Sequence, residues 1–115
     1  MKITLTTLLF LTATLTIFAQ SPEKMSYQAI VRSQDNKLIK SSPIGLQIIV
    51  HQGTATGTSQ YQETHTATTN ENGLVSLEIG TGTVQSGNFS TIAWENGPYF
   101  IEIQIDISGG TTYSI

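Results

Sequence analysis

The sequence has no cysteine, little charge and only 3 prolines. The absence of cysteine excludes disulfides, so packing of a hydrophobic core has to hold the fold together on its own. Charged residues make up 11% of the chain, less than half the usual share, which excludes a highly charged disordered tail. The formal net charge is −3, so no basic surface is available for a phosphate backbone and we expect no nucleic-acid partner.

Threonine, serine, glutamine and asparagine supply the polarity that charged side chains do not, together with 10 glycines. A helical bundle would need more lysine, glutamate, alanine and leucine. A weakly charged composition rich in threonine is typical of β-rich modules instead. With 115 residues, the chain is long enough for at most one small globular domain.

The amino terminus has the pattern of a secretory signal peptide. Lys2 is followed by an apolar stretch from Ile3 to Phe18, which is shorter than the roughly 20 residues of a membrane-spanning helix. We predict a signal-peptide helix over residues 1–19, cleavage after Ala19, and a single domain over residues 20–115. A buried amino-terminal strand is the alternative. Because no cysteine lies at the junction for a bacterial lipid anchor, we expect a secreted or cell-surface protein without a membrane span, with the periplasm as the other compartment.

Beyond the leader, apolar and polar residues alternate with the period of two that is typical of half-buried strands. The predicted strands cover Met25–Arg32, Ile44–Gln52, Thr58–Thr68, Leu74–Ile79 and Tyr99–Ile107, with a single helical turn over Phe89–Trp94. The inward face of the second strand would carry Leu46, Ile48 and Val50, and that of the last strand its alternate isoleucines. We therefore predict an all-β fold, an antiparallel β-sandwich of the immunoglobulin-like or transthyretin-like type.

Two connections and the carboxyl end carry further predictions. The run Asn70–Gly73 (NENG) predicts a tight β-hairpin between the strands on either side, because Asn and Gly both accept positive φ. Gly80–Asn88 is rich in glycine, threonine and serine and predicts a long loop. Thr111–Ile115 has the composition of a strand, but the sequence stops there. We therefore expect a sandwich that lacks its last strand and whose neighbouring edge is open to self-association.

Four ordered blocks resemble the amino-terminal β-sandwich domain of many secreted Bacteroidota surface proteins. The blocks are MSYQAIVR (Met25–Arg32), ETHTATTNENGLVSLEIGTGT (Glu63–Thr83), GNFSTIAWENGPYFIEIQID (Gly87–Asp106) and GGTTY (Gly109–Tyr113). They are similar to the family's SYQAVVR, TNxNGLFxLxIGxG and GPYF segments, over nearly all of the chain beyond the leader. A weaker similarity, carried by Thr69–Leu77, is to transthyretin-like and carboxypeptidase-regulatory-like sandwiches.

The resemblance implies a non-enzymatic structural or interaction module that forms the amino-terminal head of an exported bacterial protein. Its partners would be other surface or extracellular proteins or glycans, and neither similarity carries catalytic residues or a cofactor. The alternative is a glycan- or matrix-binding module, in which Trp94, Tyr99 and Phe100 would contact the ligand. The competing interpretation of these aromatics is that Trp94 caps an open end of the sandwich while Phe89 closes the core.

Glu63 and His65 are the candidates for chemistry, because residues two apart on a strand share a face. A metal ion would need a further ligand, for which His51 is the only other histidine. A small hydrolase using His65 is the second alternative, but it would need a serine or threonine nucleophile, and the sequence has no G-x-S-x-G elbow. We therefore predict no catalytic residue and no metal site.

Three other motifs are better explained as plain structure. Gly82–Asn88 has the G-x-x-x-x-G spacing of a phosphate loop but lacks the lysine that binds phosphate. Asn70–Asn72 offers oxygen atoms for Ca²⁺ without the pattern of an EF-hand loop. Asn88-Phe89-Ser90 matches a glycosylation sequon that a bacterial host would not use. We expect no cofactor at any of them.

Overall fold

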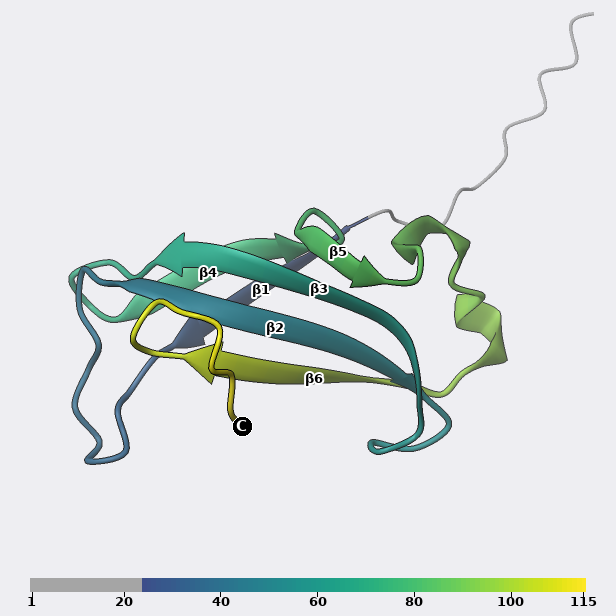
Figure 1. The fold of residues 1–115 in the computed structure, drawn as a ribbon, viewed down its shortest axis with the longest axis horizontal. Helices are drawn as coiled ribbons and strands as arrows, with labels where there is room; N and C mark the ends of the chain where they lie inside the picture. Colours follow the sequence, from purple (N-terminus) through teal and green to yellow (C-terminus); the bar gives the residue numbers. More distant parts are fainter. Residues whose placement is uncertain (1–23) are drawn as a thin grey trace, which may run out of the picture.

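The computed structural model describes residues 24–115 (Figure 1). The predicted leader over residues 1–19 and its cleavage site lie outside the described residues. The strands are β1 (Met25–Ile30), β2 (Pro43–Gln52), β3 (Thr58–Thr68), β4 (Leu74–Ile79), β5 (Thr83–Ser86) and β6 (Tyr99–Asp106). Two short 3-10 turns, η2 (Phe89–Thr91) and η3 (Trp94–Asn96), precede β6. No α-helix occurs in this part of the chain, and the predicted all-β fold is confirmed.

The strands form two antiparallel sheets. β1 pairs with β4 in a two-stranded sheet, and the other strands follow the order β5-β3-β2-β6. Figure 1 shows β1 and β4 behind β2 and β3, so that the two sheets form stacked layers. This arrangement confirms the predicted antiparallel β-sandwich and places β6 at one edge of its larger sheet.

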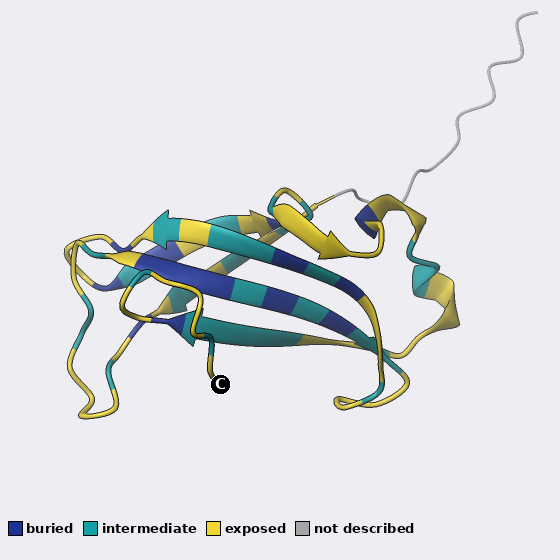
Figure 2. Cartoon of the chain, in the orientation of Figure 1, coloured by how far each residue is buried: buried dark blue, intermediate teal, exposed yellow. Residues whose placement is uncertain are grey.

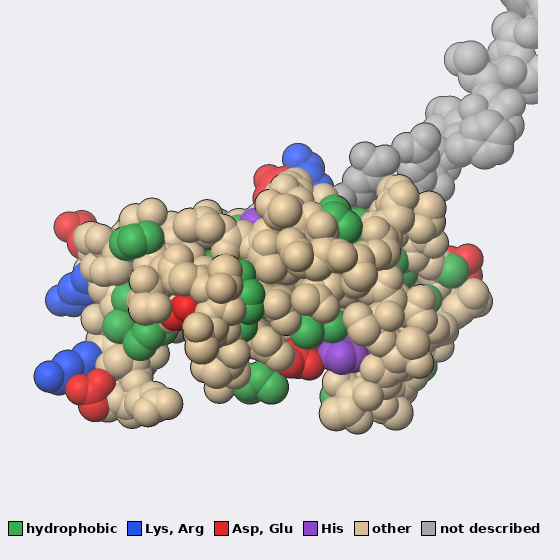
Figure 3. Space-filling view, in the orientation of Figure 1, with side chains coloured by type: hydrophobic (Ala, Val, Ile, Leu, Met, Phe, Trp, Pro, Cys, Tyr) green, Lys and Arg blue, Asp and Glu red, His purple; other side chains and the backbone are tan. Residues whose placement is uncertain are grey.

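The core lies between the two layers and follows the predicted alternation (Figure 2). The buried apolar side chains that meet there are Ile44, Leu46, Ile48 and Val50 from β2, Val75 and Ile79 from β4, and Val31 just after β1. Full burial of one such side chain stabilises the fold by about 1.5–3 kcal/mol. The visible outer surface is mostly neutral and polar (Figure 3), as the low charge content requires.

The Asn-Gly turn forms as predicted, but the predicted hairpin is wrong. The side-chain oxygen of Asn70 accepts hydrogen bonds from the backbone N–H groups of Asn72 (2.8 Å) and Leu74 (3.0 Å), and Gly73 has a φ of +76°. The flanking strands do not pair with each other, because β3 pairs with β2 and β5 whereas β4 pairs with β1. The residues of the turn determine only that the chain reverses direction there. β4 lies in the opposite layer because its apolar face and that of β3 are then both buried in the core.

The long loop predicted over Gly80–Asn88 contains a strand. β5 pairs with the edge of β3, with a bulge between Gln62 and Glu63. All side chains of β5 are exposed, so it lacks the apolar alternation by which a strand is recognised in a sequence. The helical turn predicted over Phe89–Trp94 forms as η2, and η3 begins at Trp94.

β6 follows the predicted inward alternation only in part. Ile103 and Ile105 are half-buried, but Ile101 and Ile107 are 41% and 43% exposed. The smaller layer has only two strands, and part of β6 is left uncovered. After β6 the chain turns back, and Ser114 pairs with Ile105 in an isolated antiparallel bridge.

Asp106 fixes the turn that follows β6. Its carboxylate accepts hydrogen bonds from the Ser108 hydroxyl and from the backbone N–H groups of Ser108 and Thr112, and these bonds lower the pKa of Asp106. The turn packs on Gly45 of β2, where a Cβ atom would lie only 2.2 Å from the carbonyl oxygen of Gly110. The tail is therefore held beside one end of β6 and leaves the rest of that strand uncovered.

Candidate functional site

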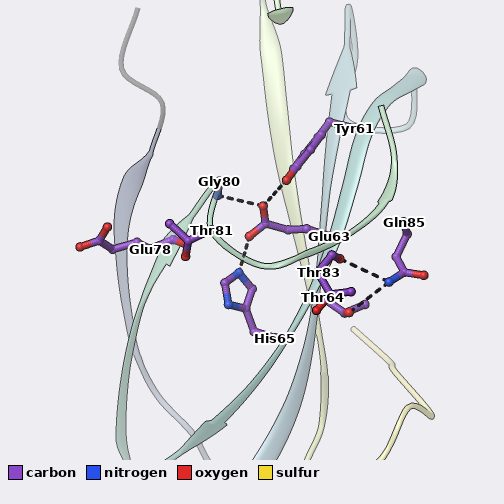
Figure 4. A network of polar contacts seen from close by, with 9 residues as sticks. All are labelled: Tyr61, Glu63, Thr64, His65, Glu78, Gly80, Thr81, Thr83 and Gln85. Atoms are coloured by element: carbon purple, nitrogen blue, oxygen red, sulfur yellow. Dashed lines mark hydrogen bonds and ion pairs between the residues drawn. The ribbon is translucent and has the colours of Figure 1, made fainter. Parts of the chain in front are cut away.

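Glu63 is a buried carboxylate at the centre of a polar network (Figure 4). It lies on the inward face of β3 and has no exposed surface. The Tyr61 hydroxyl (2.5 Å) and the backbone N–H of Gly80 (2.8 Å) donate hydrogen bonds to one carboxylate oxygen, and His65 contacts the other. Burial, and then the bond to Glu63, raise the pKa of Tyr61, so its hydroxyl keeps the proton that it donates. The network joins β3 to the segment between β4 and β5.

The Glu63–His65 pair is closed to a substrate. The side chain of His65 is only 11% exposed, and the backbone at Gly82 passes over the pair. A Cβ atom at Gly82 would lie 2.6 Å from His65 Nε2 and 2.9 Å from a Glu63 carboxylate oxygen. No serine or threonine hydroxyl within residues 24–115 is hydrogen-bonded to His65. The geometry favours a structural role, because both carboxylate oxygens of Glu63 are bound by other groups of the fold.

His51 lies on the opposite face of the larger sheet and does not approach Glu63 or His65. Its Nδ1 lies 2.9 Å from the Gly57 carbonyl oxygen and its Nε2 lies 2.8 Å from a Glu102 carboxylate oxygen. Both of these partners are hydrogen-bond acceptors, so the doubly protonated ring is the form of His51 that donates to both of them. The Gly57 carbonyl and the Glu102 carboxylate together raise the pKa of His51.

Glu102 is the acidic partner of His51 on the outer face of the larger sheet. The Gln104 amide and His51 each donate a hydrogen bond to its carboxylate, and both lower the pKa of Glu102. The pair ties β2 to β6, which are neighbouring strands. Among residues 24–115, no group of three or more His, Cys, Asp or Glu side chains is placed to hold a metal ion.

The structure separates the three aromatic residues predicted to contact a ligand. Trp94 and Tyr99 belong to a chain of edge-to-face contacts that starts in the core. The ring centroids are 5.2 Å apart for Tyr61 and Phe89, 5.5 Å for Phe89 and Trp94, and 5.1 Å for Trp94 and Tyr99. Phe89 is buried and Trp94 is partly buried against the same core cluster, a packing that is consistent with the interpretation in which Trp94 caps the sandwich and Phe89 closes the core. Phe100 points to the other sheet face and is 40% exposed.

A polar cavity of about 370 Å³ lies at the same end of the sandwich. Tyr99 is the one predicted ligand contact that lines it, beside the amide side chains of Gln52, Gln60, Asn88 and Asn96. The Gln60 amide donates to the Gln52 side-chain oxygen (3.1 Å), and the Gln52 amide donates to the Asn96 carbonyl (3.1 Å). These residues come from separate segments of the chain, and no local sequence pattern indicates that they line one cavity.

A larger groove of about 620 Å³ lies between the end of β1 and β6. Its lining includes the apolar residues Ile30, Ile103, Ile105 and Ile107 together with polar residues such as Arg32, Asp106 and Ser114. Ile101 lies on the same face of β6, because side chains alternate along a strand. Hydrophobic side chains also reach the surface along the side where β6 runs (Figure 3). The groove is therefore lined by both apolar and polar residues and opens at the edge of the larger sheet.

On the side away from β2, the backbone of β6 is paired only at Ile105. The Ile105 N–H donates to the Ser114 carbonyl (2.9 Å), and the Ser114 N–H donates to the Ile105 carbonyl (3.2 Å), on the side away from β2. Backbone groups alternate in direction along an antiparallel strand, so Ile101 and Ile103 direct their N–H and C=O groups to this side as well. Within the described chain no segment pairs with them there.

The sheet edges at β1 and β5 carry features that discourage pairing. β1 is flanked by Lys24 and Arg32, and Lys24 forms an ion pair with Glu78 of β4 (3.1 Å). β5 is only four residues long. Charged residues and short edge strands hinder the addition of another strand. The open part of β6 has neither a basic residue nor a bulge against β2, so it is better suited than β1 or β5 to bind one.

The model of the family described as Domain of unknown function (DUF8740) matches residues 26–114. The chain belongs to this family. The match begins in β1 and ends in the tail, so the DUF8740 domain includes both sheets and the bridge between Ser114 and Ile105. No curated protein and no solved structure matches the chain. Over residues 24–115 of this DUF8740 protein, no helix is long and apolar enough to cross a membrane.

Proposed function

We propose that this DUF8740 domain is a non-enzymatic interaction module of an exported bacterial protein, and that the open side of β6 accepts an extended polypeptide segment as a neighbouring strand. The observation that carries the proposal is the unpaired outer side of β6 beside the exposed side chain of Ile101. An added strand would gain main-chain hydrogen bonds from β6 and would cover apolar side chains in the groove.

Export and position in a longer protein are supported by the sequence. The stretch from Lys2 to Ala19 has the pattern of a signal peptide, and four sequence blocks resemble the amino-terminal domain of secreted Bacteroidota surface proteins. A head domain of this kind acts by binding other surface or extracellular molecules. The module would then contribute a docking surface rather than a reaction, and the closed Glu63–His65 pair is in keeping with this role.

A labelled peptide with the sequence of β6, YFIEIQID, tests the docking proposal. We expect it to bind the purified protein, and we expect Ile101→Pro to weaken binding at least tenfold. Proline is tolerated at this position because the Ile101 N–H faces away from β2, but it removes a donor from the open edge. The matched control is Val84→Thr, which replaces an exposed apolar residue of β5 at the other edge of the larger sheet and should leave the affinity unchanged. Fluorescence anisotropy measures both, and equal binding by the parent protein and Ile101→Pro would contradict docking at β6.

A glycan- or matrix-binding role is the second candidate, and the cavity beside Tyr99 favours it. Amide side chains that flank an aromatic ring can hydrogen-bond to hydroxyl groups while the ring packs against a sugar face. Trp94 is the sole tryptophan and contacts Tyr99, so its fluorescence reports binding in this cavity. Unchanged Trp94 emission on addition of polysaccharides, together with a glycan array without hits, would contradict this candidate.

A further inference from the structure

We propose that His51 is a pH-sensitive latch, which holds the loop between β2 and β3 only while its imidazole ring is doubly protonated. The ring lies between two acceptors. Its Nδ1 lies 2.9 Å from the carbonyl oxygen of Gly57 in that loop, and its Nε2 lies 2.8 Å from a carboxylate oxygen of Glu102 on β6. The side chain of His51 is only 12% exposed, so water has little access to replace either bond. One ring therefore ties the end of the β2–β3 hairpin to the neighbouring strand.

Loss of one proton leaves the ring unable to bind both acceptors. A neutral imidazole has one N–H donor and one nitrogen lone pair, whereas the Gly57 carbonyl and the Glu102 carboxylate both need a donor. In either neutral tautomer, one ring nitrogen of His51 directs its lone pair at an oxygen atom within hydrogen-bonding distance. Lone pairs that face each other repel, so one of the two contacts has to open when the ring becomes neutral.

The contact that opens is the one to Gly57. The bond from the ring to Glu102 ends on an ionised carboxylate, and such bonds are about twice as strong as those between neutral groups. The Gln104 amide donates to the same carboxylate, and this bond together with the one from His51 lowers the pKa of Glu102. Glu102 therefore stays ionised while His51 titrates. The proton that remains on the ring is the one on Nε2, and the Gly57 carbonyl is released.

The latch is closed in mildly acidic solution and open in mildly alkaline solution. The Gly57 carbonyl and the Glu102 carboxylate raise the pKa of His51 above its usual value of about 6.5. The stability that these bonds add is therefore complete below the usual value and is lost as the pH rises through the raised one. Among residues 24–115, Glu102 is the one charged group hydrogen-bonded to the ring. Ser59 and Phe100, which lie opposite His51 in the two strand pairings, carry no titratable side chain, and neither does the loop over residues 53–57.

An NMR titration of the unsubstituted protein tests the latch at the atoms concerned. We expect the His51 ring to titrate above the usual pH for histidine and to keep its remaining proton on Nε2, which the nitrogen chemical shifts of the ring distinguish from a proton on Nδ1. We expect the carbonyl carbon shift of Gly57 to change with the same midpoint. A neutral ring that keeps its proton on Nδ1 would contradict the latch, and so would a Gly57 shift that stays constant while the ring titrates.

Two variants separate the latch from general effects of pH. Glu102→Gln keeps an acceptor oxygen beside Nε2 but removes the negative charge, so we expect it to lower the midpoint of the His51 titration. His51→Gln removes the titrating ring, so we expect the Gly57 carbonyl shift to become independent of pH over the same range. An unchanged midpoint in Glu102→Gln, or a Gly57 shift that still follows the pH in His51→Gln, would overturn the proposal. The titration of the unsubstituted protein decides the matter alone if a variant does not fold.

Discussion

Replacing Glu63 with alanine is expected to lower the free energy of unfolding by about 3–5 kcal/mol. The substitution removes the shared acceptor of the Tyr61 hydroxyl and the Gly80 N–H and leaves His65 without its partner. All of these groups lie where water has little access, so each loses a hydrogen bond that solvent does not replace. The Glu63 side chain is fully buried, so the substitution also leaves a cavity.

Urea unfolding followed by circular dichroism measures this loss, and Glu63→Gln is the matched control. The amide keeps the shape of the side chain, and its oxygen still accepts from Tyr61 and Gly80. We expect Glu63→Gln to lose less than half as much stability as Glu63→Ala. A loss below about 1 kcal/mol for Glu63→Ala would mean that the network contributes little to the fold.

Replacing Ile48 with alanine is expected to cost about 2–5 kcal/mol. Ile48 has no exposed surface and packs in the cluster that contains Val50, Tyr61, Ile79 and Phe89. Removing its outer methyl groups leaves a cavity that neighbouring side chains fill only in part. The matched control is the next residue on β2, Ile49, which points to the outer face.

We expect Ile49→Ala to cost less than half as much as Ile48→Ala, by the same urea titration. Ile49 is only half-buried, so its truncation exposes little new apolar surface. The difference between the two losses in free energy of unfolding shows whether inward and outward residues alternate along β2, as the sandwich requires. Equal losses for the two variants would contradict the assignment of the β2 faces.

The alternation of residue types was sufficient to predict the strands and their inward faces. Leu46, Ile48 and Val50 alternate with polar or less buried residues, and the structure buries all three. Strand partners could not be predicted in this way, because a turn such as Asn70–Gly73 fixes a reversal without fixing which sheet receives the next strand. β5 was missed because its side chains are all exposed.

Sequence reasoning placed the polar residues on the correct faces but could not predict their partners. Glu63 and His65 were expected to share a face, and they do, but nothing local indicated that the Gly80 N–H would reach the same carboxylate. The His51–Glu102 pair joins residues that are far apart in the chain, so only the pairing of β2 with β6 brings them together.

For the aromatic residues, the sequence already indicated that Tyr99 and Phe100 do not share a surface. Tyr99 and Phe100 are adjacent on a strand, so alternation already sends them to opposite faces. They could not belong to one ligand surface together with Trp94, and the structure places Trp94 beside Tyr99 alone. The open edge of β6 was predicted from the strand composition of the tail, but which part of it stays unpaired depends on the bridge between Ser114 and Ile105.

Amide hydrogen exchange along β6 is the most direct test of the open edge. In dilute protein, we expect the Ile101 and Ile103 amides to exchange rapidly and the Glu102 and Gln104 amides, which face β2, to exchange slowly. Adding the YFIEIQID peptide should then protect the Ile101 and Ile103 amides. Slow exchange of all four amides in dilute protein, or rapid exchange of Ile101 and Ile103 under every condition, would contradict an edge that binds another strand.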